Sequence, residues 1–406
     1  MLLHAYVPNS FGPGVFIPFV KNKYELSSLK NYRPIIFTVV ISKVFKYVLI
    51  VRYGMFLNVN DRQFGFKNDL GCNSAISVLR NVIEYFNDRG SNVYLASLDA
   101  SKAFDRVNHF QLYLTLMKRC VPVAFLNIII NWYSKLTIMV RWNTAFSGTL
   151  RIRSGVRQGG VLSPHLFNVY ADVFINSVAS KKNGCYFNRC CVACIMYADD
   201  LMLLSASAFG LQQLLDDCAL IAMDLCLQFN DKKSYCIVVG PKNKCKLSCL
   251  SLSGKHLQWV DSVKYLGITF VSSKVFSVDL NQVRHKFFGC TNSILVHSSG
   301  VSELVKLHLM ESYCYPVLSY ALESLNLSSS NVNHLNVFWN SVYRRIFDFR
   351  SWESVKELIC CLERMNFEYL YHQKKFCFLH NMLRSDSSII VSVMSFFIQS
   401  NEYVKL

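Results

Sequence analysis

Acidic side chains are scarce in this chain of 406 residues. Asp and Glu together number 26, whereas Lys and Arg number 43, which gives a formal net charge of +17. An excess of this size favours a polyanionic partner over a small neutral substrate, with nucleic acid the first candidate and an anionic membrane the second. Hydrophobic residues make up 52% of the chain, so a disordered polymer is excluded and two or three subdomains are expected.

Long uninterrupted apolar runs are also missing. The most apolar windows, 34–51 and 121–140, are interrupted by Lys43, Lys46 and Lys135, so neither is expected to cross a bilayer. The start of the chain lacks the basic segment and apolar core of a signal peptide. We therefore expect an intracellular protein, in the nucleus or the cytoplasm, with no membrane partner.

The 16 cysteines form no regular framework. Cys185, Cys190, Cys191 and Cys194 cluster, but their spacing matches no zinc-finger pattern, and the last two enter an apolar segment. We expect reduced, buried thiols, no disulfide scaffold and no zinc site.

Two adjacent carboxylates, Asp199 and Asp200, stand between the apolar runs 192–196 and 201–204. This pattern predicts two buried strands joined by a tight turn. Two ionised carboxylates side by side are costly without a cation, and no Lys or Arg lies near them in the sequence. A divalent metal is the favoured partner. For an isolated Asp-Asp pair, a hairpin tip pointing into water would be the ordinary alternative.

The segments around this pair alternate between strand and helix patterns. A helix is expected over 74–86, and the apolar segment 93–98 predicts a strand that delivers Asp99 at its end. A further helix is expected through Leu112 to Met117, and Asp105 before it is either a site residue or a helix cap.

Later segments continue the alternation. Residues 137–152 predict a hairpin with Gly148 near its turn, followed by a glycine loop over 154–160 and a helix. Strands are expected over 235–239 and 263–270, and the chain beyond 280 has a helical, basic pattern.

These segments carry a series of motifs that resembles, in composition and order, the motifs of non-LTR (LINE-type) retrotransposon reverse transcriptases. The motifs are Asn31-Tyr32-Arg33-Pro34, Gln63-Phe64-Gly65-Phe66, Leu98-Asp99-Ala100-Ser101-Lys102-Ala103-Phe104-Asp105, Gly155-Val156-Arg157-Gln158-Gly159 with Leu162-Ser163-Pro164, Tyr197-Ala198-Asp199-Asp200, the run from Asn230 to Ser234, and Tyr265-Leu266-Gly267. The resemblance implies the polymerase portion of such an element, with an α+β right-hand polymerase fold. Fingers and palm over 1–280 would contain an antiparallel palm sheet with helices behind it, followed by a helical thumb over 281–350 and a C-terminal helical extension over 351–406.

The resemblance also assigns catalytic residues. Asp99, Asp199 and Asp200 would bind two Mg²⁺ ions, with Mn²⁺ as the substitute. Lys233 would protonate pyrophosphate, and neighbouring Lys232 is the competing assignment.

Binding residues follow from the same resemblance. The expected nucleotide-binding set is Arg33, Lys67, Phe104, Gln158 and Gly159. Within it, Phe104 is either a steric gate against a ribose 2′-hydroxyl or a core aromatic. The expected primer-binding set is Tyr197, Tyr265, Leu266 and Gly267.

The expected activity is that of an RNA-directed DNA polymerase, a nucleotidyltransferase that extends a DNA primer on an RNA template with dNTPs. Only a short segment precedes the first motif, so we expect endonuclease activity to come from elsewhere. The alternative is a catalytically decayed nucleic-acid-binding remnant of such an element. A membrane-surface protein is disfavoured, because no basic amphipathic helix is tied to an anchor.

Overall fold

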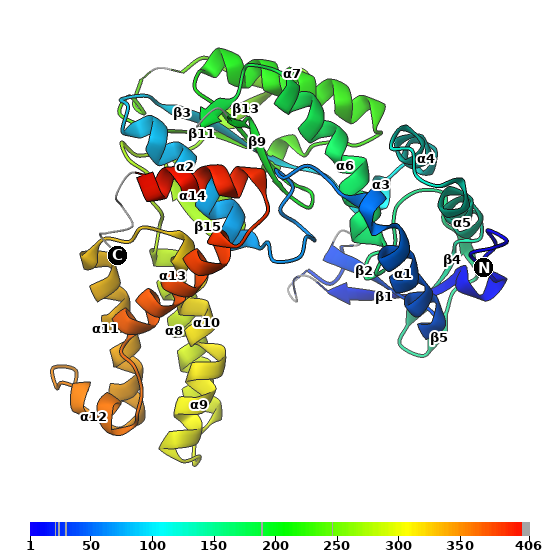
Figure 1. Cartoon of the computed structure of the whole chain (residues 1–406). Coiled ribbons are helices and arrows are strands. Elements are labelled where there is room, and N and C mark those ends of the chain that lie inside the picture. Colours follow the sequence, from blue (N-terminus) through cyan, green and yellow to red (C-terminus); the bar gives the residue numbers. More distant parts are fainter. Residues whose placement is uncertain (21, 23–24, 29–30, 188–189, 246, 400–406) are drawn as a thin grey trace.

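Three groups of elements make up the molecule. The structure, a computed structural model, describes residues 1–20, 22, 25–28, 31–187, 190–245 and 247–399, without the side chains of Arg33, Pro34, Phe397 and Gln399. Figure 1 shows a central sheet with helices, a second sheet beside helix α1 on one side, and a set of helices on the other. We call these groups the palm, the fingers and the thumb with its extension.

The palm is built on a six-stranded sheet in the order β12-β13-β11-β3-β10-β9. Its neighbours are antiparallel except for the parallel pair β11 and β13, so the expected antiparallel palm sheet is present. The strands are β3 (Val93–Asp99), β9 (Cys194–Tyr197), β10 (Asp200–Ser205), β11 (Tyr235–Val239), β12 (Leu250–Leu252) and β13 (Lys255–Trp259).

Helices cover both faces of this sheet. Because side chains alternate along a strand, Leu201 and Leu203 of β10 pack in one core cluster with residues of α6 (Ser163–Ser180) and α7 (Ala208–Asp224). Met202 and Leu204 pack in a second cluster with α2 (Cys72–Asn87). Burial on both faces holds the strand ends, and the residues that follow them, in fixed positions.

The fingers contain a smaller sheet in the order β2-β1-β4-β5, with β6 paired to β4. Phe45 of α1 stacks on Trp132 of α5 at 5.8 Å between ring centroids, which joins the helices beside this sheet. The elements are η1 (Asn9–Phe11), β1 (Pro13–Val20), β2 (Tyr32–Phe37), α1 (Val40–Tyr53), η3 (Gly54–Leu57), α3 (Ala103–Arg106), α4 (His109–Lys118), α5 (Val123–Ser134), β4 (Thr137–Trp142), β5 (Ala145–Phe146) and β6 (Leu150–Arg151).

Two turns differ from the sequence expectation. The chain reverses between β4 and β5 at Asn143, whose φ is +54°, and not near Gly148. Residues 263–270 form two antiparallel strands and not one, β14 (Ser262–Tyr265) and β15 (Ile268–Val271). Leu266 and Gly267 between them have φ values of +46° and +85°, as a tight two-residue hairpin turn requires. Because Leu rarely adopts a positive φ, the sequence did not indicate a turn at this point.

Beyond β15 the described chain is helical, as expected. Figure 1 shows α8 to α11 extending away from the palm, whereas α14 returns to it. The remaining elements are α8 (Asn281–His297), α9 (Glu303–Tyr313), α10 (Tyr315–Leu318), η5 (Leu322–Ser324), α11 (Ser329–Ile346), α12 (Lys356–Cys361), α13 (Phe367–Leu383) and α14 (Ser388–Gln399), with the hairpin β7 (Cys185–Phe187) and β8 (Cys190–Val192) at the palm and η4 (Asp231–Lys233) before β11. The boundaries at 280 and 350 stay predictions.

The C-terminal helix α14 is attached to the palm by specific contacts. Asp61 accepts hydrogen bonds from the main-chain nitrogen of Ser388 at 2.7 Å and from its hydroxyl at 2.6 Å. Phe396 meets the edge of Tyr85 in α2 at 5.3 Å between centroids. Within the described part of the chain, no helix combines the length and the apolar character needed to span a membrane.

Candidate active site

Three carboxylates gather at one edge of the palm sheet. Asp99 ends β3, and the residue directly opposite it in β10 is Asp200. Asp200 also pairs with Tyr197 of β9, so Ala198 and Asp199 form a two-residue turn between the strands. Ala198 has a φ of +56°, an unusual backbone conformation for a residue other than Gly. The predicted hairpin is confirmed, and it places Asp199 beside the other two carboxylates.

Electrostatics at this edge favour a cation. Burial, together with the charges of Asp199 and Asp99, raises the pKa of Asp200 to about 6. Burial also raises the pKa of Asp199, with a smaller contribution from Asp99. Among the described residues, no Lys, Arg or His forms an ion pair with any of the three. A bound cation would relieve this repulsion.

The donor set consists of carboxylate oxygens only, which are the ligands that Mg²⁺ and Mn²⁺ prefer. Asp99, Asp199 and Asp200 therefore fit a divalent metal in their chemistry. In the part of the chain that the structure describes, no group of three or more His, Cys, Asp or Glu side chains is already arranged around a common metal position.

The segment that carries Lys233 is tied to the end of β3. The Asn230 N–H donates to the carbonyl of Asp99 at 2.8 Å, and the Asp99 N–H donates to the hydroxyl of Ser234 at 3.2 Å. Lys232 and Lys233 lie between these two contacts, in η4, and both side chains are exposed. The main chain of this segment is thus held beside Asp99, while both ammonium groups stay in solvent.

The predicted nucleotide-binding residues Phe104, Gln158 and Gly159 lie on two segments that pair with each other. The Val156 N–H donates to the carbonyl of Phe104 at 2.8 Å, and the Gln158 side-chain amide donates to a carboxylate oxygen of Asp105 at 3.1 Å. Gly159 is exposed and has a φ of +83°. Asp105 therefore orients Gln158, and α4 is capped by Asn108, not by Asp105.

The Phe104 ring is half-buried and has aromatic neighbours. It stacks on Phe167 of α6 with centroids 4.3 Å apart and meets the edge of Phe66 at 6.1 Å. This packing fixes the direction of the ring, as either a gate or a core residue requires.

The other two predicted nucleotide-binding residues are not brought to this point. The Lys67 ammonium donates to the carbonyls of Val59 at 3.0 Å and Asn60 at 2.8 Å, and it lies 3.8 Å from a carboxylate oxygen of Asp61. Burial lowers its pKa. The main chain of Arg33 lies in β2 opposite Phe19, and its side chain is outside the described part of the structure.

Arg157, in the glycine loop, points away from the nucleotide-binding residues. Its buried guanidinium donates to the carbonyls of Gly12, of Thr137 at 3.2 Å and of Phe11 at 3.4 Å, and burial lowers its pKa to about 10. Arg157 thus joins the loop to the fingers sheet.

Three of the predicted primer-binding residues, Tyr265, Leu266 and Gly267, lie on the β14–β15 hairpin, which has one unexpected partner. The buried Tyr265 hydroxyl donates to the carbonyl of Ile195 at 3.2 Å, which fixes the β14–β15 hairpin against β9. The Tyr320 hydroxyl donates to the carbonyl of Leu266 at 3.0 Å, and its ring lies against the exposed Gly267. Sequence reasoning missed Tyr320, because it lies 54 residues from its partner.

Tyr197, which pairs with Asp200, lies next to Cys72 of α2. Its side chain is half-buried, and burial, with the Cys72 thiol, raises its pKa to about 12. Tyr197 therefore stays protonated at neutral pH.

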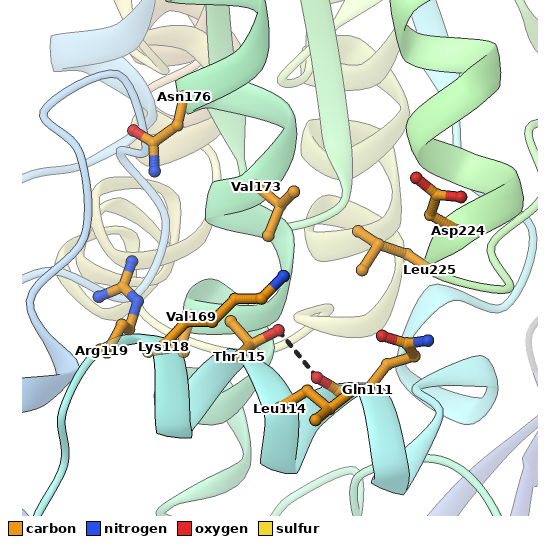
Figure 2. Close-up of a pocket in the computed structure, with 10 residues that line it drawn as sticks. All are labelled: Gln111, Leu114, Thr115, Lys118, Arg119, Val169, Val173, Asn176, Asp224 and Leu225. Carbon is orange, nitrogen blue, oxygen red and sulfur yellow. Dashed lines mark hydrogen bonds between the residues drawn. The ribbon is translucent and has the colours of Figure 1, made fainter.

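A sizeable pocket lies elsewhere, between α4, α6 and the end of α7. Figure 2 shows its polar groups around an apolar floor that includes Val169, Val173 and Leu225. Its volume is about 380 Å³. None of the predicted site residues lines it, so we do not assign the chemistry to this pocket.

Comparison with known proteins identifies the family of this chain. Residues 20–270 match the family model described as "Reverse transcriptase (RNA-dependent DNA polymerase)". A Pol polyprotein from the type-2 retrotransposable element R2DM of Drosophila melanogaster is 29% identical over 63% of this chain. The RNA-directed DNA polymerase from the mobile element jockey of the same organism is 25% identical over 84% of this chain.

This chain spans only part of those relatives, 25% of the R2DM protein and 38% of the jockey protein. Among solved structures, apo telomerase from Candida tropicalis is similar with a TM-score of 0.49 and 12% identity, over 95% of this chain and 69% of that one. The family match covers most of the chain and includes every acidic residue of the site. The chain belongs to the reverse transcriptases, in the group carried by non-LTR retrotransposons.

Proposed function

We propose that this chain extends a DNA primer on an RNA template by nucleotidyl transfer from dNTPs. The observation that carries the proposal is the position of Asp99 opposite Asp200, with Asp199 on the adjoining turn, in a chain of this family. Asp99, Asp199 and Asp200 would hold Mg²⁺, with Mn²⁺ as the substitute. Two such ions, when bound, activate the attacking 3′-oxygen and stabilise the leaving pyrophosphate.

The side chains around the aspartates act on the nucleotide in this proposal. Gln158, oriented by Asp105, and Gly159 line the pocket, and Phe104 limits the space beside the sugar. Lys233 donates a proton to the leaving pyrophosphate, and Lys232 on the same exposed turn is the competing donor.

Arg33 and Lys67 are the remaining candidates for contact with template or triphosphate. Lys67 would have to leave the carbonyls of Val59 and Asn60 before it could reach a phosphate. We therefore rank it below Gln158 as a nucleotide contact.

The primer end would lie against Tyr197 and the turn of the β14–β15 hairpin. Gly267 leaves that turn open to solvent, and Tyr265 and Tyr320 hold it in place from behind. Because α10 and η5 flank Tyr320, the thumb and the primer-binding turn are mechanically linked.

The test is primer extension by the purified chain on a primed RNA template with dNTPs and Mg²⁺. Template-length DNA supports the proposal, provided that it requires both the RNA and the metal. Tight binding of the primed template without any extension would favour the alternative, a catalytically decayed nucleic-acid-binding remnant. Supercoiled plasmid in a parallel reaction should stay uncut, since we propose that target nicking comes from elsewhere.

We also propose an intracellular location, in the nucleus or the cytoplasm. All 16 cysteines are free in the structure, which suits a reducing compartment. Fractionation of cells that express a tagged chain tests this, and recovery from the medium would contradict it.

A further inference from the structure

The motif segment around Gln63 lies alongside the hairpin that carries Asp199. The Met196 N–H donates to the carbonyl of Arg62 at 2.8 Å, and the Phe64 N–H donates to the carbonyl of Met196 at 2.8 Å. These two bonds form an isolated parallel bridge between Gln63 and Met196. The segment therefore adds a one-residue bridge to the outer edge of the palm sheet, alongside β9 and next to the Ala198–Asp199 turn.

The Gln63 side chain uses both ends of its amide at this point. Its oxygen accepts from the N–H of Ala198 at 2.9 Å and from the N–H of Gly65 at 2.9 Å. Its nitrogen donates to the carbonyl of Ala198 at 3.3 Å. Ala198 is the residue with positive φ that directly precedes Asp199, so one side chain holds its N–H and its carbonyl together.

The contact is buried and closely packed. Gln63 is 0% exposed, so water does not compete for these hydrogen bonds. A Cβ added at Gly65 would overlap the main-chain nitrogen of Ala198, and the carbonyl of Gly65 accepts from the side chain of Asn168 at 2.8 Å. The turn is thus supported from a segment far away in the sequence, and little room remains for it to move.

Only a neutral amide of this length supplies both functions. Two N–H groups need an acceptor, and the Ala198 carbonyl needs a donor. The carbonyl belongs to the peptide that joins Ala198 to Asp199, so its orientation sets the direction in which the Asp199 side chain leaves the main chain. Groups that orient a metal ligand in this way typically change metal affinity by roughly 10–100-fold when they are removed.

We propose that Gln63 is a positioning residue, which holds the Ala198–Asp199 peptide so that the Asp199 carboxylate faces Asp99 and Asp200. It touches neither substrate nor the reacting atoms. The proposal rests on the proposed function, because it assigns Asp199 a metal.

The test compares Gln63→Met, which keeps the volume and removes both hydrogen-bonding functions, with wild type. The matched control is Asn81→Leu, which removes another buried amide, one that donates to the carbonyl of Ser77 at 2.7 Å within α2. The first readout is the affinity for Mn²⁺ alone, measured from the electron paramagnetic resonance signal of the free ion. The second is hydrogen exchange of the peptide 194–204. The third is the Mg²⁺ concentration that gives half-maximal extension.

In Gln63→Met we expect Mn²⁺ affinity to fall by about tenfold or more, exchange at the turn to speed up and the half-maximal Mg²⁺ concentration to rise. The Asn81→Leu control should lose thermal stability without any of these changes. Unchanged Mn²⁺ affinity in a folded Gln63→Met protein would overturn the proposal and leave Gln63 as packing only.

A second variant keeps the test decisive if Gln63→Met does not fold. Burial raises the pKa of a carboxyl at this position, so Gln63→Glu is compared with wild type at pH 8, where its ionised form retains the acceptor for the N–H groups and loses the donor to the Ala198 carbonyl. Its added negative charge would by itself strengthen Mn²⁺ binding, so weaker binding must come from displaced geometry, and equal or stronger binding contradicts the proposal. A wild type that binds Mn²⁺ but never extends a primer would defeat the proposed function and leave the positioning role testable by affinity.

Discussion

Asp99 at the end of β3 and Asp200 at the start of β10 are direct neighbours across an antiparallel strand pair. Side chains at such positions share one face of the sheet, so their charges act on each other at close range. Burial, with the charges of Asp199 and then Asp99, raises the pKa of Asp200 to about 6. The fold therefore holds acidic groups together that repel each other at neutral pH unless a cation lies between them.

Asp200→Asn should be more thermally stable than wild type in metal-free buffer at pH 7.5. The pKa of Asp200 is about 6 in the folded state and near 3.8 in the unfolded state. Asp200 therefore contributes fully to stability only below about pH 3.8, and this contribution is lost as the pH rises through about 6. The advantage of the variant should shrink by roughly half or more at pH 4.5. Melting temperatures at both pH values test this.

Mg²⁺ provides the control for that comparison. At pH 7.5 it should raise the melting temperature of wild type more than that of Asp200→Asn, because the variant lacks one carboxylate ligand. If Asp200→Asn is less stable than wild type without metal at pH 7.5, burial and like charges do not destabilise the ionised Asp200 carboxylate.

Phe104→Val should relax the choice between deoxynucleotides and ribonucleotides. If the ring excludes a 2′-hydroxyl, its loss should lower discrimination by roughly 10–200-fold while dNTP use persists. The measurement is the ratio of dNTP to rNTP incorporation on one primed template. The matched control is Phe167→Leu, which disturbs the stacked partner at 4.3 Å without opening the sugar side.

A core role for Phe104 gives a different pattern. Phe104→Val and Phe167→Leu would then lose activity and thermal stability together, with an unchanged sugar ratio. A well-folded Phe104→Val protein with wild-type discrimination would rule out the gate.

The acidic site was predictable because its signals are local. The apolar runs on both sides of Asp199 and Asp200 predict the hairpin, and the strand over 93–98 predicts that Asp99 lies at a strand end. The family resemblance supplied the pairing of strands that lie a hundred residues apart, which periodicity alone does not contain.

The supports of the site were not predictable, because they depend on contacts between distant segments. Lys67 and Arg157 are basic residues in or next to motifs, yet both direct their charge to main-chain carbonyls. Leu266 adopts a positive φ that its residue type does not signal, and Tyr320 secures it from the thumb side. Such roles follow from tertiary packing and leave no local pattern.

Template binding should depend steeply on salt. The formal charge of +17 suits a phosphate backbone, and about six phosphate contacts would weaken affinity by about 10³ or more between 50 and 200 mM salt. Fluorescence anisotropy with a primed RNA template at several salt concentrations measures this slope. A flat response would favour a partner other than nucleic acid.

Primer extension by Asp199→Asn is the most direct test of the account. The substitution keeps the size of the side chain on the turn and removes a charged ligand, so extension should fall by about 100-fold or more while the melting temperature is maintained. Asp217→Asn is the matched control, since Asp217 lies in α7, outside the motifs, and pairs with Lys181 at 3.0 Å. Asp217→Asn should extend primers as wild type does. Extension by Asp199→Asn within threefold of wild type would contradict the assignment of these aspartates as the catalytic centre.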